Sequence, residues 1–311
     1  MAFRGSYVAL ITPFQKNGRV DWKTLEKLIE WHIASGTDGI VCCASTGEGA
    51  TLSESERKKV AEVCIRVSAR RVPVIASTGL NDTRKTVKAT EEAQKLGADG
   101  CLVVTPYYNR PTPRGCVLHF QEVAKVGLPL ILYHNPCRAV VRLSAETIVQ
   151  ISQIPNVVGL KDAAQDIELI RKIRKMAPQF SIFSGDDDCT FSILQEGGSG
   201  VISVICNLIP AGWTKMIHLS LKGEWERAKI LADRYMPLCK AHFLETNPQC
   251  IKFALSWVGK CQSTLRLPLV EPLETTQKQI KAAIFTCTAC PQYTPSLPRV
   301  RVLIPKKSLS H

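Results

Sequence analysis

The sequence predicts an α/β protein, a closed (β/α)8 TIM barrel with a small C-terminal helical appendage. Eight short apolar runs alternate with amphipathic helical segments at intervals of roughly 25–30 residues, which is the rhythm of repeated βαβ units. The runs show little polar alternation, as is typical of a parallel sheet covered on both faces. The alternative, an open doubly wound sheet, would favour a glycine-rich turn after the first strand, but that turn reads Thr12-Pro13-Phe14.

Strands are expected where short apolar runs lie between turn residues. They cover residues 8–11, 38–43, 74–76, 100–104, 130–133, 157–160, 181–183 and 201–204. The helices between them begin at recognisable caps: Asp21 precedes the first, and Ser53-Glu54-Ser55-Glu56 forms a capping box for the second. Gly36 and Gly97 end the first and third helices.

The chain divides into three parts by pattern. Residues 1–222 carry the strand–helix alternation of the barrel, and residues 223–284 are helical only, with segments expected at 224–238 and 249–258. Residues 285–311 form an atypical basic tail that contains four prolines and the run Arg299-Val300-Arg301-Val302. No structure is predicted for this tail.

The composition restricts the partners. The net charge is +13, but six positive charges lie after Glu274 with no acidic residue among them: Lys278, Lys281, Arg299, Arg301, Lys306 and Lys307. The rest is only modestly basic and carries no nucleic-acid-binding motif, so we expect no nucleic-acid partner. The longest uncharged run, residues 197–214, is interrupted by Gly and Pro, and no secretory signal opens the chain. A cytoplasmic protein without membrane contact is expected.

Thirteen cysteines are scattered over strand and helix positions, which favours reduced core thiols over a disulfide framework. Cys287 and Cys290 form the only CxxC, without a second pair or a histidine at ligand spacing. Asp186-Asp187-Asp188 could indicate a divalent metal, but the alternative is a helix N-terminus that favours negative charge. We therefore expect no metal site.

Lys161 follows the apolar run 157–160, at the end of a strand. An apolar environment favours the neutral form of an amine, and a neutral amine is a nucleophile that forms a Schiff base with a carbonyl substrate. The alternative is a lysine that has reached the surface where the strand ends. In a barrel, however, the active site lies at the carboxyl ends of the strands.

Other strands end in residues that suit Schiff-base chemistry. The fifth supplies a phenol, Tyr133, that can move protons, and an arginine, Arg138, that can hold a carboxylate. Taken alone, Arg138 could equally be a surface ion-pair residue, and Tyr107 and Tyr108 a packed aromatic pair.

These residues occur in motifs, and the motifs match a family. They are Ser45-Thr46-Gly47-Glu48, Thr105-Pro106-Tyr107-Tyr108-Asn109, Tyr133 with Asn135-Pro136 and Arg138, Gly159-Leu160-Lys161-Asp162-Ala163, and Ser184-Gly185-Asp186-Asp187. In combination they resemble the class I aldolase family typified by dihydrodipicolinate synthase and N-acetylneuraminate lyase, from about residue 5 to residue 269.

The resemblance implies roles for individual residues. Lys161 would form the imine with pyruvate, and Tyr133 would carry protons for that step. Ser45, where synthases usually have Thr, would link Tyr133 to Tyr108, which in this family reaches into the site of a neighbouring subunit. Thr46 would hold the pyruvate carboxylate. The remaining substrate-binding residues would be Arg138, for the carboxylate of the aldehyde, Gly185 and Ile202.

The resemblance also implies the reaction. Pyruvate would condense with L-aspartate 4-semialdehyde to give 4-hydroxy-tetrahydrodipicolinate in lysine (diaminopimelate) biosynthesis. No cofactor would be needed, because pyruvate itself becomes covalently bound to Lys161. A homotetramer or homodimer is expected. Two alternatives remain: another pyruvate-dependent aldolase, acting on N-acetylneuraminate or a 2-keto-3-deoxy sugar acid, and a non-catalytic barrel used for binding.

The sequence departs from the family at two places. Ala139-Val140 follow Arg138 where synthases usually have Thr-Gly, which could loosen the loop that frames the arginine. At positions matching the lysine-binding pocket of feedback-inhibited synthases, Asn81 and Tyr107 remain, but the chain has Gly49, Glu54, Arg57 and Lys85. Lys85 in place of an acid would repel a lysine ammonium, so weak or absent lysine feedback is predicted.

Overall fold

Eight parallel strands close into a barrel in the computed structural model, which describes residues 3–288. Each strand pairs with its neighbours in the sequence, and β8 pairs with β1 to close the ring. The strands are β1 Gly5–Ala9, β2 Gly39–Cys42, β3 Val74–Ser77, β4 Gly100–Val104, β5 Leu130–His134, β6 Val157–Asp162, β7 Ser181–Ser184 and β8 Gly200–Ser203. The predicted fold class is confirmed.

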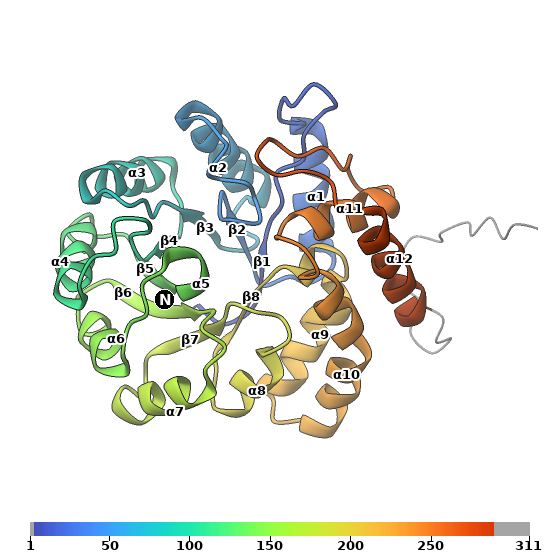
Figure 1. Cartoon of the computed structure of the whole chain (residues 1–311). Helices are drawn as coiled ribbons and strands as arrows, with labels where there is room; N and C mark the ends of the chain where they lie inside the picture. Colours follow the sequence, from blue (N-terminus) through green and yellow to red (C-terminus); the bar gives the residue numbers. More distant parts are fainter. Residues whose placement is uncertain (1–2, 289–311) are drawn as a thin grey trace, which may run out of the picture.

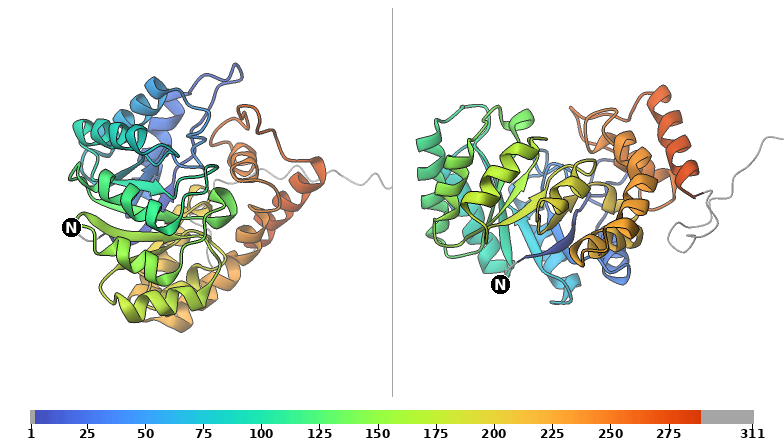
Figure 2. Two further views of the ribbon diagram at one scale, coloured as in Figure 1. Left: turned by 60° about the vertical axis from the view of Figure 1, so that its left-hand side comes forward. Right: turned by 90° about the horizontal axis from the view of Figure 1, so that it is seen from below.

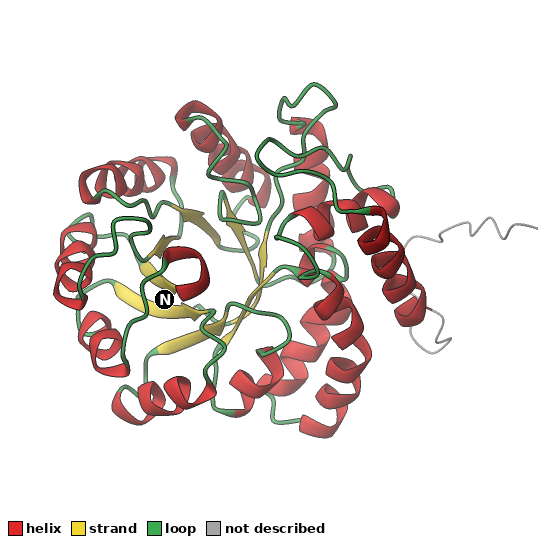
Figure 3. Ribbon diagram, in the orientation of Figure 1, coloured by secondary structure: helices red, strands yellow, loops and turns green. Residues whose placement is uncertain are grey.

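Helices surround the strands, as Figures 1 and 3 show. Those of the barrel are α1 Trp22–Ala34, α2 Glu54–Ser68, α3 Thr83–Leu96, α4 Pro113–Ala124, α5 Pro136–Ala139, α6 Ala145–Ser152, α7 Ile167–Met176, α8 Thr190–Gln195, the 3-10 turn η1 Ile205–Asn207 and α9 Pro210–Leu221. Three more helices follow: α10 Trp225–Ala241, α11 Gln249–Trp257 and α12 Glu274–Thr288.

Local signals placed several helix ends correctly. Asp21 caps α1, and the capping box of Ser53 and Glu56 is present at α2. Gly97 ends α3 in the left-handed conformation with φ of 87°, which glycine adopts without steric cost. These ends could be predicted because cap and helix lie within one turn of each other.

β1 and β6 differ most from the predicted ranges, while the other strands agree to within one residue at each end. β1 lies earlier than residues 8–11, because Gly5 pairs with Gly200 of β8 while the N–H of Ile11 leaves the ladder and donates to Asn207 Oδ1 at 3.1 Å. β6 is longer than residues 157–160, because Lys161 and Asp162 still pair with Phe183 and Ser184 of β7. Lys161 is therefore part of the strand and not of the loop after it.

The core has two parts. A large cluster fills the space between the strands and the surrounding helices, and a smaller one fills the inside of the barrel. In the inner cluster the rings of Tyr7 and Phe183 meet edge to face, with 5.6 Å between their centroids. Tyr133 and Ile202 belong to this inner cluster, so both are held inside the barrel.

The C-terminal helices pack on one side of the barrel, as Figure 2 shows. α10 packs against α9 and α12, and α11 packs against α12. α12 continues to Thr288, so the expected start of the tail at residue 285 falls inside this helix. Cys287 is buried, and its thiol donates a hydrogen bond to the Arg234 carbonyl oxygen at 3.2 Å. Cys290, Arg299, Arg301, Lys306 and Lys307 lie outside the described residues.

Candidate active site

Lys161 lies inside the barrel and is only 4% exposed. Its register partner on β5 is Tyr133, and its Nζ atom lies 4.2 Å from the centroid of the Tyr133 ring. Within residues 3–288 Lys161 forms no hydrogen bond and no ion pair. A buried amine without a hydrogen-bonding partner is unusual, because buried charged groups are normally paired. This lysine is available to react.

His134 and Asp162 join the ends of β5 and β6. They are register partners, and His134 Nδ1 lies 2.7 Å from Asp162 Oδ1, with both side chains buried. The N–H of Leu143 donates to His134 Nε2 at 3.0 Å, so the ring proton lies on Nδ1 and is donated to the carboxylate. Because Tyr133 and Lys161 precede these two residues, the bond holds both reactive side chains at a common level.

The phenol oxygen of Tyr133 has one hydrogen-bond partner in the described chain, which is Asn135 Nδ2 at 2.7 Å. Ser45 is half-buried on the loop after β2 and forms no hydrogen bond with Tyr133 within residues 3–288. The expected relay from Tyr133 through Ser45 is thus not closed in a single copy of the chain.

Tyr108 lies apart from the rest of the site. It is 88% exposed and has a φ of 72°, an uncommon backbone conformation for a residue with a side chain. The turn is held by Asn109, whose Nδ2 donates to the Asn81 carbonyl oxygen at 2.8 Å. Tyr107 and Tyr108 are not a buried aromatic pair, and the turn presents Tyr108 to the outside of this copy.

Thr46 and Arg138 are linked through Asn247, which lies between α10 and α11. Asn247 Nδ2 donates to Thr46 Oγ1 at 3.0 Å, and Arg138 Nη2 donates to the Asn247 carbonyl oxygen at 3.0 Å. Arg138 has no acidic partner in the described chain, which disfavours the surface ion-pair interpretation. The C-terminal region therefore positions both residues expected to bind carboxylates.

Gly185 and Ile202 lie in tightly packed parts of the barrel. The Gly185 N–H donates to the Asp162 carbonyl oxygen at 2.6 Å, and a Cβ atom on Gly185 would lie 2.7 Å from that oxygen. Only glycine fits against the end of β6. Ile202 is fully buried on β8.

The three aspartates after Gly185 do not cap a helix. Asp187 Oδ2 accepts the N–H groups of Val204 and Ile205 at 3.0 and 2.7 Å, and α8 begins later, without a side-chain cap. Burial raises the pKa of the Asp187 carboxyl to about 6. Burial also raises the pKa of Asp186, and the nearby Lys161 opposes that rise. In the described part of the chain no group of three or more His, Cys, Asp or Glu residues could hold a metal ion.

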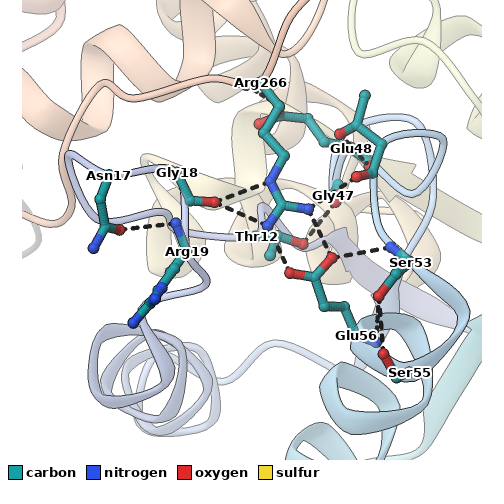
Figure 4. Close-up of polar contacts among 11 residues, drawn as sticks. Thr12, Asn17, Gly18, Arg19, Gly47, Glu48, Ser53, Ser55, Glu56 and Arg266 are labelled. Carbon is teal, nitrogen blue, oxygen red and sulfur yellow. Dashed lines mark hydrogen bonds and ion pairs between the residues drawn. The ribbon is translucent and has the colours of Figure 1, made fainter.

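A second buried lysine lies under the Thr46 loop. Lys252 Nζ contacts Glu48 Oε1 at 2.6 Å and donates to the Thr264 carbonyl oxygen at 2.8 Å. Glu48 Oε2 accepts the N–H of Arg266 at 3.1 Å, and the Arg266 guanidinium binds both oxygens of Glu56 (Figure 4). These bonds attach the C-terminal region to the loop that carries Thr46.

A cavity of about 230 Å³ lies between α2 and α3. Its lining combines small apolar side chains with charged ones, among them Glu54, Arg57, Lys85 and Lys88. Glu54 already has a cation nearby, since Lys88 Nζ lies 3.9 Å from its Oε2. Of the residues predicted to decide lysine feedback, Glu54, Arg57 and Lys85 border this cavity.

The sequence assigned no role to several residues of the site, although Asn135 stands in the Tyr133 motif. Asn135 and His134 stand beside Tyr133, but their roles depend on contacts across strands. Asn247 and Lys252 are far from the barrel motifs in the chain. The Asn247-Pro248 peptide in this stretch is cis. No helix within residues 3–288 is long and apolar enough to span a membrane.

Comparison with known proteins supports the resemblance. The model of the dihydrodipicolinate synthetase family matches residues 2–286. The 4-hydroxy-tetrahydrodipicolinate synthase of Thermodesulfovibrio yellowstonii is 44% identical over 280 residues, which cover 89% of this chain and 96% of that protein.

Solved structures agree with the sequence relatives. The dihydrodipicolinate synthase of Acinetobacter baumannii, complexed with pyruvate, is 40% identical with a TM-score of 0.90, covering 91% of this chain and 98% of that one. The enzyme of Cyanidioschyzon merolae, with lysine bound, is 36% identical with a TM-score of 0.89, covering 92% and 99%. The chain belongs to the dihydrodipicolinate synthetase family.

Proposed function

We propose that this chain is a Schiff-base lyase that condenses pyruvate with L-aspartate 4-semialdehyde to 4-hydroxy-tetrahydrodipicolinate. The observation that carries the proposal is the buried Lys161 amine, which has no hydrogen-bonding partner in the described chain and lies against the Tyr133 ring. The proposal is also supported by the relatives of this chain, which are named 4-hydroxy-tetrahydrodipicolinate synthase. The pyruvate complex of the Acinetobacter baumannii protein supports pyruvate as the first substrate.

The first half of the reaction makes a nucleophile of pyruvate. The lone pair of Lys161 Nζ attacks the keto carbon, the keto oxygen leaves as water, and an imine remains. Tyr133 supplies a proton to the departing oxygen and accepts one in turn. The imine withdraws electrons, so the methyl group of pyruvate loses a proton and an enamine forms. Thr46 holds the carboxylate during these steps.

The second half forms the carbon–carbon bond. The enamine carbon attacks the aldehyde carbon of the semialdehyde, whose oxygen takes up a proton and becomes the hydroxyl group. The amino group of the same substrate then attacks the imine carbon, closes the ring and releases Lys161. Arg138 holds the carboxylate of the incoming aldehyde, since a guanidinium can bind a carboxylate through two N–H groups. Neither half needs a metal ion or an organic cofactor.

A second copy of the chain completes the proton path in this proposal. Tyr108 is almost fully exposed, and its positive φ turns it to the outside of this copy, where a neighbouring subunit could receive it. In a homodimer or homotetramer it would reach the partner's Ser45, which would pass protons to Tyr133. We place this assembly in the cytoplasm.

The test is turnover in three separate assays: condensation of pyruvate with L-aspartate 4-semialdehyde, cleavage of N-acetylneuraminate, and cleavage of a 2-keto-3-deoxy sugar acid. We expect turnover of the first alone, and borohydride with pyruvate to add mass to the peptide that contains Lys161. Arg138→Ala should keep this adduct and lose turnover. The absence of an adduct would contradict every pyruvate aldolase function for this chain. Turnover of N-acetylneuraminate or of a 2-keto-3-deoxy sugar acid alone would show that L-aspartate 4-semialdehyde is not the second substrate.

A further inference from the structure

Asn135 lies between Tyr133 and the short helix α5, and its side-chain amide is used at both ends. Its Oδ1 accepts the backbone N–H of Arg138 at 3.1 Å, and its Nδ2 donates to the phenol oxygen of Tyr133 at 2.7 Å. The side chain is buried, with 7% exposed. The two bonds fix the orientation of the amide, because only its oxygen can accept an N–H and only its nitrogen can donate to the phenol.

The orientation of Asn135 determines what the phenol can do. A phenol oxygen that accepts the Asn135 N–H must donate its own proton in another direction. The Tyr133 ring lies against Lys161 Nζ, and no other residue in the range 3–288 makes a hydrogen bond with the phenol. The same N–H also stabilises the negative charge that the oxygen carries once its proton has been given away.

We propose that Asn135 is a positioning residue: by donating to the Tyr133 phenol oxygen it turns the phenol proton away from itself and toward the substrate bound at Lys161, and it ties this orientation to the turn that carries Arg138. The inference rests on the proposed Schiff-base function and adds to it. Tyr133 touches the reacting groups, whereas Asn135 acts only through Tyr133. The simpler alternative is that Asn135 is nothing more than the N-cap of α5.

Substitution by aspartate separates these two roles. Asn135→Asp keeps an oxygen that accepts the Arg138 N–H, and Asp is as good an N-cap as Asn. It cannot donate to Tyr133, so the phenol would turn and donate its proton to the new carboxylate. Ser144→Ala is the matched cap control, because Ser144 caps α6 through a 3.3 Å bond from the Thr147 N–H and forms no hydrogen bond with Tyr133, Asn135 or Lys161 within residues 3–288.

The experiment measures the rate of imine formation with pyruvate by timed borohydride quenching, together with kcat, KM and the melting temperature. Asn135→Asp should slow imine formation at least about tenfold, within the range that a positioned proton donor contributes, while the KM for pyruvate stays within about twofold. Its melting temperature should change no more than that of Ser144→Ala, and Ser144→Ala should form the imine at the wild-type rate.

A double variant shows whether Asn135 acts through the phenol. In a Tyr133→Phe background the added Asn135→Asp change should slow imine formation no further, because the group on which it acts is gone. An equal further loss in that background, or an Asn135→Asp rate within twofold of wild type, would overturn the inference. A wild-type enzyme without any pyruvate adduct would instead overturn the proposed function itself.

Discussion

The surroundings of Lys161 and Lys252 differ in one respect that decides what each lysine does. Both side chains are buried, with 4% and 0% of the residue exposed. Lys252 contacts Glu48 Oε1, the Thr264 carbonyl oxygen and the face of the Phe14 ring. Lys161 has the Tyr133 ring as its neighbour and no hydrogen-bond acceptor in the described chain.

The comparison teaches that burial alone does not make a lysine reactive. Burial lowers the pKa of Lys252, but Glu48 opposes that shift and holds the ammonium in place. The Lys252 ammonium is held by two fixed acceptors, Glu48 Oε1 and the Thr264 carbonyl oxygen, so we assign it a structural role. Lys161 lacks such partners within residues 3–288, so no hydrogen bond holds its Nζ atom away from a substrate. The four predictions below test this difference, starting with the largest expected effect.

Replacing Lys161 by Met should abolish catalysis without unfolding the protein. We expect turnover to fall at least about a thousandfold, as when a covalent nucleophile is removed. The free energy of unfolding should stay equal or rise, because no hydrogen bond is lost and an apolar side chain takes the place of an amine. Turnover assays and urea unfolding of both proteins measure this, and a stability loss of several kcal/mol would show that Lys161 has a structural partner.

Replacing Lys252 by Met should have the opposite profile. Glu48 would remain as a buried carboxylate without its ammonium partner and with the Arg266 N–H as a donor, and breaking a buried pair in this way costs about 3–5 kcal/mol. Urea unfolding should show this loss, while the folded fraction still traps pyruvate on Lys161. Adding Glu48→Gln to Lys252→Met removes the charge and should restore much of the stability. If Lys252→Met were as stable as wild type, the Glu48–Lys252 pair would contribute nothing to the free energy of unfolding.

The salt bridge of Arg266 and Glu56, which lies next to the Glu48–Lys252 pair, should make a pH-dependent contribution to the free energy of unfolding. The hydrogen bond from Arg266 lowers the pKa of Glu56 from 4.5 to about 2. Since the folded pKa lies below the unfolded one, this stability is present above pH 4.5 and is lost as the pH falls toward 2. Arg266→Gln should therefore destabilise the protein at pH 7, by roughly 1–3 kcal/mol, and the difference should shrink between those two values.

The control for Arg266 is Arg71→Gln. Arg71 also holds a glutamate, Glu30, through two hydrogen bonds, but these side chains are 44% and 53% exposed, so the loss should be smaller at every pH. Unfolding curves between pH 2 and pH 7 compare the two variants. A difference for Arg266→Gln that does not change with pH would contradict the assigned role of Glu56.

Free lysine tests whether an ammonium from solution also needs an acidic partner in order to bind. The smallest effect of the four is expected here. At the α2–α3 cavity, Lys85 and Lys88 repel an added ammonium, and Lys88 already lies near Glu54. Added lysine should leave turnover unchanged. Inhibition would require an unoccupied carboxylate in the cavity to bind the ammonium of the ligand, as Glu48 binds the ammonium of Lys252. Lys85→Glu supplies such an acid and is the matched variant. Inhibition of the wild type by micromolar lysine would overturn the prediction.

Prediction from the sequence succeeded where the signal was local or lay in a motif. The strand rhythm predicted the closed barrel, and the capping box at Ser53 predicted the start of α2. The level of Lys161 was predicted less well, since the strand around it is longer than the apolar run 157–160. Whether Lys161 stays in the ladder depends on its pairing with Phe183, and that partner is not apparent from the neighbouring residues.

By itself the sequence determined the barrel, the family and the residues that end its strands, because apolar periodicity, helix caps and motifs act over a few neighbouring positions. Only the tertiary structure decided which buried lysine has partners. Glu48 and Lys252 stand 204 positions apart, and Thr46 and Asn247 stand 201 apart, yet both pairs are hydrogen-bonded. Such contacts depend on how the barrel closes and where the C-terminal helices pack against it, which no local pattern encodes.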